Sequence, residues 1–338
     1  MNISILGAGS WGIALSELLA TKGYQVRMWE FDAGEARMLS ERREHPQKLP
    51  GIRIPESVLI TNSVAASLEG AQYVICAVPA QVTRQAAKVL ATSVPPAVCA
   101  AVKAWIIVSK GIECATLELL SDVLKDEVAG LSDDRIVILS GPSHAEEVSR
   151  NIPTTVVAAS TNNDLAVAIQ NEFSTETFRI YTNNDTVGVQ LCASVKNVIA
   201  LAAGICDGLG FGDNTKGALL TRGMVEMARL GTRMGADQAT FAGLAGFGDL
   251  ITTCISRHSR NRRMGEFIGS GMTLKEALTH MTMVAEGVET TKSVYELARK
   301  HGIEMPISTE VYRTLFEGKP ARQAVRDLML RQVRPEVY

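Results

Sequence analysis

Short apolar runs alternate with stretches of helical spacing through the first half of the chain. Each run is of a length suited to one buried strand. The runs are residues 3–6, 25–29, 73–78, 104–108, 136–139 and 154–158. Strands that alternate with helices predict an α/β fold, doubly wound, with a mostly parallel sheet and helices on both faces. Because ligands bind beyond the carboxyl ends of such strands, the residues that follow each run are the candidates for function.

The pattern changes near Asp185, after which the apolar positions keep helical spacing. Thr273 and Glu276 form a capping-box signature, and Gly302 is placed to end a helix over residues 288–301. We therefore expect a dinucleotide-binding domain at 1–186, an all-helical substrate and catalytic domain at 187–330, and a loose polar tail at 331–338.

Composition narrows the class of protein. The chain has 338 residues, which exceeds the size of a typical single core and agrees with two domains. The formal charge of −2 gives no basic excess, so a nucleic-acid partner is not expected. The six cysteines form no C-x-x-C pair and the five histidines have no metal-ligand spacing, so no metal is expected. No leader or membrane-spanning run is recognised, which predicts a cytoplasmic protein without membrane insertion.

Three glycines follow the first apolar run at the spacing G-x-G-x-x-G. Gly7 allows a tight turn, Gly9 lets a pyrophosphate approach the backbone, and Gly12 lets helix and strand pack closely. A chance glycine turn is the alternative, but the position between a strand and a helix favours a dinucleotide site. The fold is therefore expected to be Rossmann-like.

The end of the second run bears on the choice of cofactor. An acidic residue about 20 positions past the glycine loop binds the adenosine ribose and favours NAD. Glu30 and Asp32 are acidic, and Phe31 between them could flank the adenine. Two surface acids at a strand end are the alternative interpretation. NAD is the expected cofactor, with NADP possible.

Two lysines stand in unusual surroundings. Lys196 lies with Asn197 in a nearly apolar helical stretch, where a lysine either extends to water or is buried at a site. Burial would lower its pKa and suit it to general acid–base work near neutral pH. Lys110 follows a predicted strand, where it either contacts a ligand or is a solvated loop residue.

Two polar stretches interrupt the helical half. Asp249 follows a glycine-rich segment, and residues 256–263 contain four arginines. Ser259 could cap a helix whose N-terminus, with Arg260 and Asn261, would hold a phosphate. A solvated helix face is the alternative.

These motifs together resemble the NAD(P)-dependent sn-glycerol-3-phosphate dehydrogenase family over roughly residues 1–320. The most specific stretch is the central run at residues 206–216 (CDGLGFGDNTK). The other matching stretches are residues 7–12, 109–111, 141–148, 195–198, 249–254, 260–262 and 286–287.

The resemblance implies reversible reduction of dihydroxyacetone phosphate to sn-glycerol 3-phosphate, a glycerophospholipid precursor, by a homodimer. It implies that Lys196 exchanges the proton at the C2 oxygen and that Lys110 polarises that oxygen. The implied substrate contacts are Lys110, Gly141, Ser143, Lys196, Asn197, Asp249, Ser259, Arg260 and Asn261. The nucleotide contacts that the resemblance implies are Ser10, Trp11, Lys110, Ala145, Arg260, Val284 and Glu286. They join Gly7, Gly9, Gly12, Phe31 and Asp32, which the glycine loop and the end of the second run predict.

The chain departs from the common bacterial pattern at Phe31 and Asp32, where many members carry basic residues. His144 occupies a variable position, so a surface or packing role is expected for it. A related two-domain dehydrogenase of hydroxy acids or sugar acids, and a non-catalytic NAD-binding sensor, are the alternative functions. The run at 206–216 argues against the first, and the pair Lys110 and Lys196 argues against the second.

Overall fold

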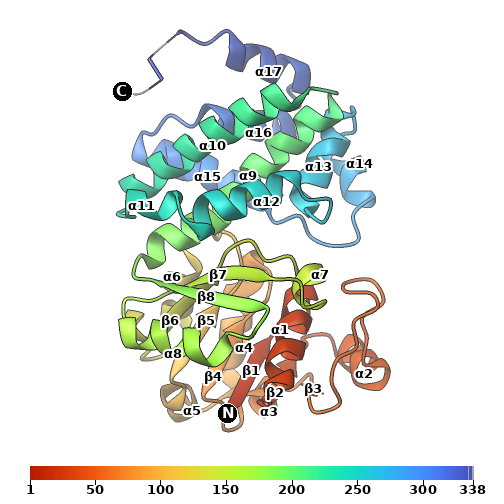
Figure 1. Ribbon diagram of the computed structural model, residues 1–338, viewed down its shortest axis with the longest axis vertical. Coiled ribbons are helices and arrows are strands. Elements are labelled where there is room, and N and C mark those ends of the chain that lie inside the picture. Colours follow the sequence, from red (N-terminus) through yellow and green to blue (C-terminus); the bar gives the residue numbers. More distant parts are fainter. Residues whose placement is uncertain (334, 337–338) are drawn as a thin grey trace.

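The computed structural model describes residues 1–333 and 335–336. Figure 1 shows two stacked halves, a sheet flanked by helices and a bundle of helices. The sheet half is built from the first part of the chain and the bundle from the rest, and α9 passes from one to the other.

The sheet has eight strands in the order β3-β2-β1-β4-β5-β6-β7-β8. All neighbouring pairs are parallel except β6 with β7, so the last two strands run against the others. The mostly parallel Rossmann-like sheet predicted from the sequence is therefore confirmed. The strands are β1 (Asn2–Leu6), β2 (Gln25–Trp29), β3 (Leu59–Thr61), β4 (Tyr73–Cys76), β5 (Ala104–Ile107), β6 (Ile136–Ser140), β7 (Thr154–Ala159) and β8 (Phe178–Asn183).

Helices connect the strands on the two faces of the sheet (Figure 1). Short 3₁₀ turns at Ala80–Val82 and Asp133–Arg135 complete these connections. The helices are α1 (Ser10–Thr21), α2 (Ala33–Arg42), α3 (Val64–Leu68), α4 (Thr83–Ser93), α5 (Pro96–Ala101), α6 (Leu120–Glu127), α7 (Ala145–Val148) and α8 (Asn163–Phe173).

The second half is helical throughout its described part, as the sequence predicts. The Thr273 capping box forms, and Gly302 ends α15 in the left-handed conformation at φ 65°. A π-helical turn at Leu244–Gly248 leads into α12. The helices are α9 (Thr186–Gly208), α10 (Asp213–Arg233), α11 (Gln238–Phe241), α12 (Asp249–Ile255), α13 (Arg260–Gly269), α14 (Leu274–Thr279), α15 (Gly287–His301), α16 (Pro306–Phe316) and α17 (Ala321–Met329).

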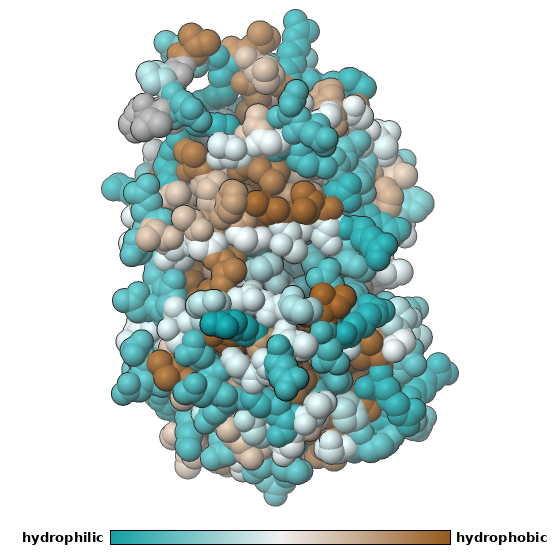
Figure 2. Space-filling view, viewed as in Figure 1, coloured by the Kyte–Doolittle hydropathy of each residue, from teal (hydrophilic) through white to brown (hydrophobic). Residues whose placement is uncertain are grey.

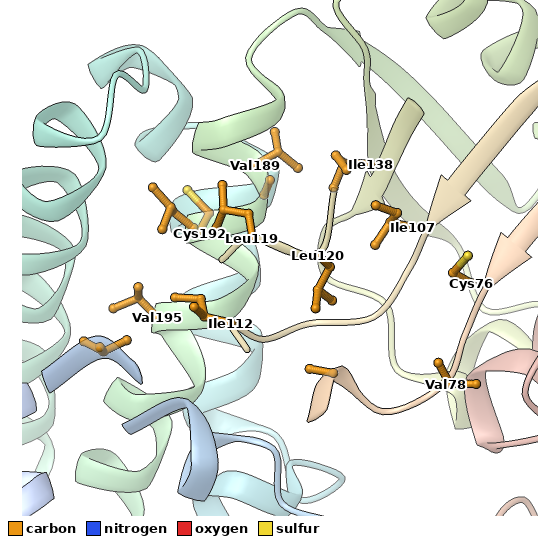
Figure 3. Close-up of a cluster of buried hydrophobic side chains, with 14 of the residues drawn as sticks. Cys76, Val78, Ile107, Ile112, Leu119, Leu120, Ile138, Val189, Cys192 and Val195 are labelled. Carbon is orange, nitrogen blue, oxygen red and sulfur yellow. The ribbon is translucent and has the colours of Figure 1, made fainter. Parts of the chain in front are cut away.

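Helix α9 is the buried axis of the molecule. Val189, Cys192 and Val195 on this helix belong to a single apolar cluster that also includes Cys76 and Ile107 of the sheet. Figure 3 shows the segment with Ile112, Leu119 and Leu120 lying between the helix and the strands. One hydrophobic core therefore joins the two halves, and it fixes α9 against the sheet.

The length of α9 corrects one expectation. No apolar run of membrane-spanning length was expected, but α9 is long and apolar enough for that by length and composition. A bent pair, 238–255 with 260–269, passes the same test when taken as one span. The whole apolar window of α9 is buried inside the fold, as in the core helices of globular proteins.

Glycines bring α9 and α13 into backbone contact. A Cβ atom added at Gly204 of α9 would lie 1.8 Å from the carbonyl oxygen of Arg262, and one added at Gly265 of α13 would lie 2.1 Å from that of Leu201. Gly208 and Gly269 continue this contact one turn further along each helix. Only glycine allows so close an approach, and this contact fixes the position of the N-terminus of α13 relative to α9.

The C-terminal segment follows α17. Residues 331–333 and 335–336 form no helix or strand. The predicted loose tail covers 331–338, of which residues 334, 337 and 338 lie outside the described part of the chain.

Candidate active site

A cleft of about 590 Å³ lies where the carboxyl ends of the central strands meet the helical half. It collects residues from the glycine loop, from the segments after β4, β5 and β6, and from α9, α12 and α13. The sequence-predicted residues that line it are Gly7, Gly9, Ser10, Trp11, Phe31, Lys110, Ser143, Ala145, Lys196, Asn197, Asp249, Ser259, Arg260, Asn261, Val284 and Glu286.

Lys196 is buried at this cleft, with 3% of its surface exposed, and does not extend to water. Its Nζ donates to Oδ1 of Asp249 at 2.8 Å and to Oγ1 of Thr253 at 2.6 Å. Burial lowers the pKa of Lys196 to about 8, although the Asp249 carboxylate acts in the opposite direction. An ammonium has three protons to donate, and these two bonds use two of them.

Lys110 approaches the same carboxylate from the sheet half. Its Nζ donates to Oδ2 of Asp249 at 2.9 Å and to the carbonyl oxygen of Gly141 at 3.2 Å. Asp249 is 2% exposed. Burial alone would raise its pKa, but Lys110 and Lys196 outweigh this effect and hold the pKa below its usual value. The result is a triad of two buried groups and the half-buried Lys110, with one net positive charge, suited to an anion or a developing alkoxide.

The N-terminus of α13 faces the cleft. Ser259 is its N-cap and accepts from the backbone N–H of Arg262 at 3.2 Å, as the sequence suggests. Asn261 Oδ1 accepts from the N–H of Gly287 at 2.9 Å, which ties this end of α13 to the start of α15. A helix N-terminus carries partial positive charge and free N–H groups, so this end of α13, with the Arg260 side chain, is suited to an anion.

Ion pairs beside the central run at 206–216 hold α13 in place. Asp207 accepts from Nε of Arg262 at 2.7 Å and pairs with Nζ of Lys216 at 2.5 Å. Arg262 also pairs with Glu266 one turn further along α13. The most specific sequence motif therefore supports the anion site and does not itself line the cleft.

The glycine loop fits the pyrophosphate of a dinucleotide. Gly7 has φ 110°, and a Cβ at Gly12 would lie 2.1 Å from the Gly7 carbonyl oxygen, so both glycines are required by the turn. A Cβ at Gly9 would meet nothing within 4 Å, which leaves the approach to the loop open. No side chain caps the N-terminus of α1, so its backbone N–H groups remain for a phosphate.

The acidic residues after β2 take different positions. Glu30 lines the cleft, and its carboxylate accepts from the N–H of Ala8 at 3.3 Å and of Asp32 at 3.2 Å. Asp32 is the N-cap of α2 and accepts from the N–H of Glu35 at 2.7 Å. Phe31 is 73% exposed at the cleft. The carboxylate nearest the expected ribose position is therefore that of Glu30.

Three predicted residues do not line the cleft: Gly12, Asp32 and Gly141. Gly12 lies under the loop, and Gly141 acts through its carbonyl oxygen, which accepts from Lys110 and from Ser143 Oγ at 3.1 Å. The structure adds Thr253 and His144, which the sequence did not single out as site residues. It also brings Glu30 to the cleft, one of the two acids that the sequence analysis noted at the end of the second run.

Glu286 joins the two halves at the cleft. Its buried carboxylate accepts from the N–H of Ala80, after β4, at 3.1 Å. Burial raises the pKa of Glu286 although this hydrogen bond opposes the shift. Arg260 donates to the carbonyl oxygen of Val284 at 3.2 Å. This hydrogen bond joins two of the predicted nucleotide contacts.

A glycine-loop sheet, a buried lysine and an anion site facing one cleft define a two-domain dinucleotide-dependent dehydrogenase of an anionic substrate. Two family models match the chain. The N-terminal domain model of NAD-dependent glycerol-3-phosphate dehydrogenase matches residues 2–166 and the C-terminal one matches residues 185–326. The chain belongs to this family of NAD(P)-dependent oxidoreductases.

Individual relatives agree over the full length of the chain. A glycerol-3-phosphate dehydrogenase [NAD(P)+] of Chlorobium limicola is 48% identical, with all of both chains covered. That of Pelotomaculum thermopropionicum is 50% identical over 98% of this chain and 93% of its own. The crystal structure of glycerol-3-phosphate dehydrogenase from Coxiella burnetii superposes with a TM-score of 0.92 at 38% identity, covering 98% and 99% of the two chains.

Proposed function

We propose that this chain catalyses reversible hydride transfer between NAD(P)H and dihydroxyacetone phosphate, giving sn-glycerol 3-phosphate. The observation that carries the proposal is the Lys196–Asp249–Lys110 triad beside the N-terminus of α13. A triad of net positive charge suits the C2 oxygen, and the helix end suits the phosphate. The bound nicotinamide supplies or accepts the hydride.

Lys196 is the proposed proton donor and acceptor. Asp249 and Thr253 accept hydrogen bonds from two of its ammonium N–H groups, which leaves the third for the substrate. In reduction Lys196 gives this proton to the C2 oxygen, and in oxidation the neutral amine takes it back. A pKa of about 8 makes both forms accessible near neutral pH.

Lys110 is the proposed electrostatic partner of the C2 oxygen. It is held by Asp249 and by the Gly141 carbonyl oxygen, so its ammonium group cannot move far from the reacting atoms. Preorganised positive charge stabilises an alkoxide more in a buried site than in water. Ser143 and Asn197, which also line the cleft, are the proposed contacts for the remaining substrate hydroxyl.

The substrate phosphate is assigned to Ser259, Arg260 and Asn261. Binding the phosphate at this end of the substrate orients C2 toward the triad, so the free energy of phosphate binding is used to align the reacting atoms. The cofactor is assigned to Gly7, Gly9, Ser10, Trp11, Gly12, Phe31, Asp32, Lys110, Ala145, Arg260, Val284 and Glu286. To this set we add Glu30, whose carboxylate in the cleft would repel a 2′-phosphate and supports NAD over NADP.

The chain is proposed to divide into a dinucleotide-binding domain at 1–186 and a helical domain at 187–330. The boundary falls at the start of α9, between the last strand and the first helix of the bundle. We also propose a cytoplasmic setting, as the sequence analysis expects. A role in supplying a glycerophospholipid precursor is proposed from the family resemblance.

A homodimer is proposed on the same basis. A groove of about 710 Å³ on the helical half has a mixed lining, in which apolar residues of α10, α16 and α17, among them Leu219, Ile307 and Leu328, alternate with charged ones. Figure 2 shows apolar side chains gathering on one face of that half. Sedimentation of the wild type and of a Leu219→Glu variant tests this assignment. A monomeric wild type would contradict it.

The activity is tested by the loss of NADH absorbance with dihydroxyacetone phosphate, compared with unphosphorylated dihydroxyacetone. The expected result is turnover that depends on the phosphate group and falls sharply in Arg260→Gln. Hydroxy-acid activity without glycerol-3-phosphate activity would refute the assignment. Absence of any oxidation by folded protein that binds NADH would favour a sensor.

A further inference from the structure

His144 occupies an unusual position in the cleft. It lies just after β6, where it precedes α7, and its ring lines the cavity with Lys110 and Lys196. The Nε2 atom is buried and has no hydrogen-bond partner among the described residues. A buried ring nitrogen without a partner is costly, and a phosphate that accepts a hydrogen bond from it would remove that cost.

A second histidine faces His144 from the other half of the molecule. His258 directly precedes the Ser259 cap of α13 and also lines the cleft. The centroids of the two imidazole rings lie 5.9 Å apart, with the ring planes at 51°. One ring therefore comes from the sheet half and the other from the helical half, beside the proposed phosphate site.

The charges around His144 favour an anion beside the two imidazole rings. Burial, with the positive charges of Lys196, Lys110 and His258, lowers the pKa of His144 to about 4, and Asp249 opposes the shift only in part. His144 is therefore neutral in the free protein at pH 7. The surrounding positive charge keeps His144 neutral and would attract a phosphate dianion. The bound dianion would in turn make the surroundings of His144 negative and raise its pKa.

We propose that His144 and His258, whose rings lie side by side at the cleft, bind the substrate phosphate together, and that His144 gains a proton when the phosphate binds. This inference rests on the proposed placement of the phosphate at the N-terminus of α13. His144 is a positioning residue here, because it holds the phosphate and takes no part in the transfer at C2. The pair also joins the two halves through the substrate.

The test replaces each imidazole by a ring of similar shape without hydrogen-bonding atoms. His144→Phe is expected to raise KM for dihydroxyacetone phosphate about tenfold or more, since a hydrogen bond to a charged group is lost. The kcat should stay within about threefold and KM for NADH should not change. His258→Phe should act in the same direction, and His144→Asn, which keeps an N–H donor, should recover part of the loss.

Two readouts separate phosphate binding from packing. The increase in KM for dihydroxyacetone phosphate caused by His144→Phe should be larger at pH 6 than at pH 8. The reason is that only a protonatable ring binds the phosphate more tightly as the pH falls. The penalty should be absent with unphosphorylated dihydroxyacetone. His301→Phe, at the end of α15 and outside the cleft, is the matched control and should leave all constants unchanged.

An unchanged KM in His144→Phe, or an equal penalty with the unphosphorylated ketone, would overturn the inference. Arg260→Gln separates it from the proposed function. If Arg260→Gln leaves KM for dihydroxyacetone phosphate unchanged, the placement of the phosphate at α13 is wrong. If Arg260→Gln raises KM and His144→Phe does not, only the histidine inference fails. Should His144→Phe fail to bind NADH, His144→Asn and His258→Phe still decide the question through the pH dependence of KM.

Discussion

Replacing Asp249 by asparagine should move the pH dependence of the reaction. The carboxylate lies 2.8 Å from Nζ of Lys196 and 2.9 Å from Nζ of Lys110, and it is the group that separates the two ammonium ions. The amide side chain would keep much of the shape and one acceptor oxygen but would leave two positive charges facing each other. The pKa of Lys196, already lowered to about 8 by burial, would fall further.

The size of this effect follows from the contact. An opposite charge at this distance typically supports a pKa by about 1–3 units, so its loss would bring Lys196 to roughly 5–7. At pH 7.5 about three quarters of Lys196 is protonated in the wild type, against about one in thirty if the pKa is about 6. Ketone reduction needs the protonated form, so the rate at pH 7.5 should fall about 25-fold and recover near pH 5.5.

Single-turnover oxidation of enzyme-bound NADH, measured from pH 5 to pH 9, avoids interference from product release. Thr253→Val is the matched control, because it removes the other hydrogen-bond acceptor of Lys196 without removing a charge. That variant should shift the profile by much less. An Asp249→Asn profile with its midpoint still near 8 would refute the role given to the carboxylate and to Lys196.

Other consequences of the structure are open to direct measurement. Lys196→Ala should lower kcat by about 10²–10⁴-fold and leave NADH binding nearly intact; an equal loss of cofactor affinity would contradict the assignment. Oxidation of glycerol 3-phosphate by the wild type should rise with pH through about 8, because it needs neutral Lys196; a flat profile would exclude this base. Glu30→Ala should raise the preference for NADPH over NADH about tenfold, and Asp32→Asn, which keeps the helix cap, should raise it by less because Asp32 does not line the cleft. Gly265→Ala, whose Cβ would lie 2.1 Å from the Leu201 carbonyl oxygen, should cost about 1–3 kcal/mol or more in calorimetry, while Gly217→Ala, with nothing within 4 Å, should cost none.

The sequence pattern predicted most of the sheet but missed two strands. β3 has only three residues, too few for a period of two to be recognised. β8 alternates between buried and exposed positions only over residues 178–181, which is too short to be recognised as a strand from the sequence. The antiparallel pairing of β6 with β7 also depends on tertiary contacts, because both strands read as similar apolar runs.

The candidate site was predicted unevenly for physical reasons. The sequence placed Lys196 in an apolar helix, but whether it reached water depended on Asp249 and Thr253, more than fifty residues away. Asp32 also caps α2, a role that Glu35 three positions later signals and that the sequence analysis did not assign. His144 gave no local signal at all. Its surroundings come from separate segments that only the fold brings together.

Helix α9 explains why these distant parts can act on one substrate. At its start, Val189 and Cys192 pack in the core shared with the sheet, which fixes the helix relative to the strand ends and Lys110. One turn further, Lys196 reaches the cleft, and beyond it Gly204 and Gly208 set the backbone contact with α13. The distance between the proton donor and the phosphate site is therefore set along one buried helix. A substitution at the glycine contact should accordingly raise KM for dihydroxyacetone phosphate more than KM for NADH, because it displaces α13 and leaves the glycine loop in place.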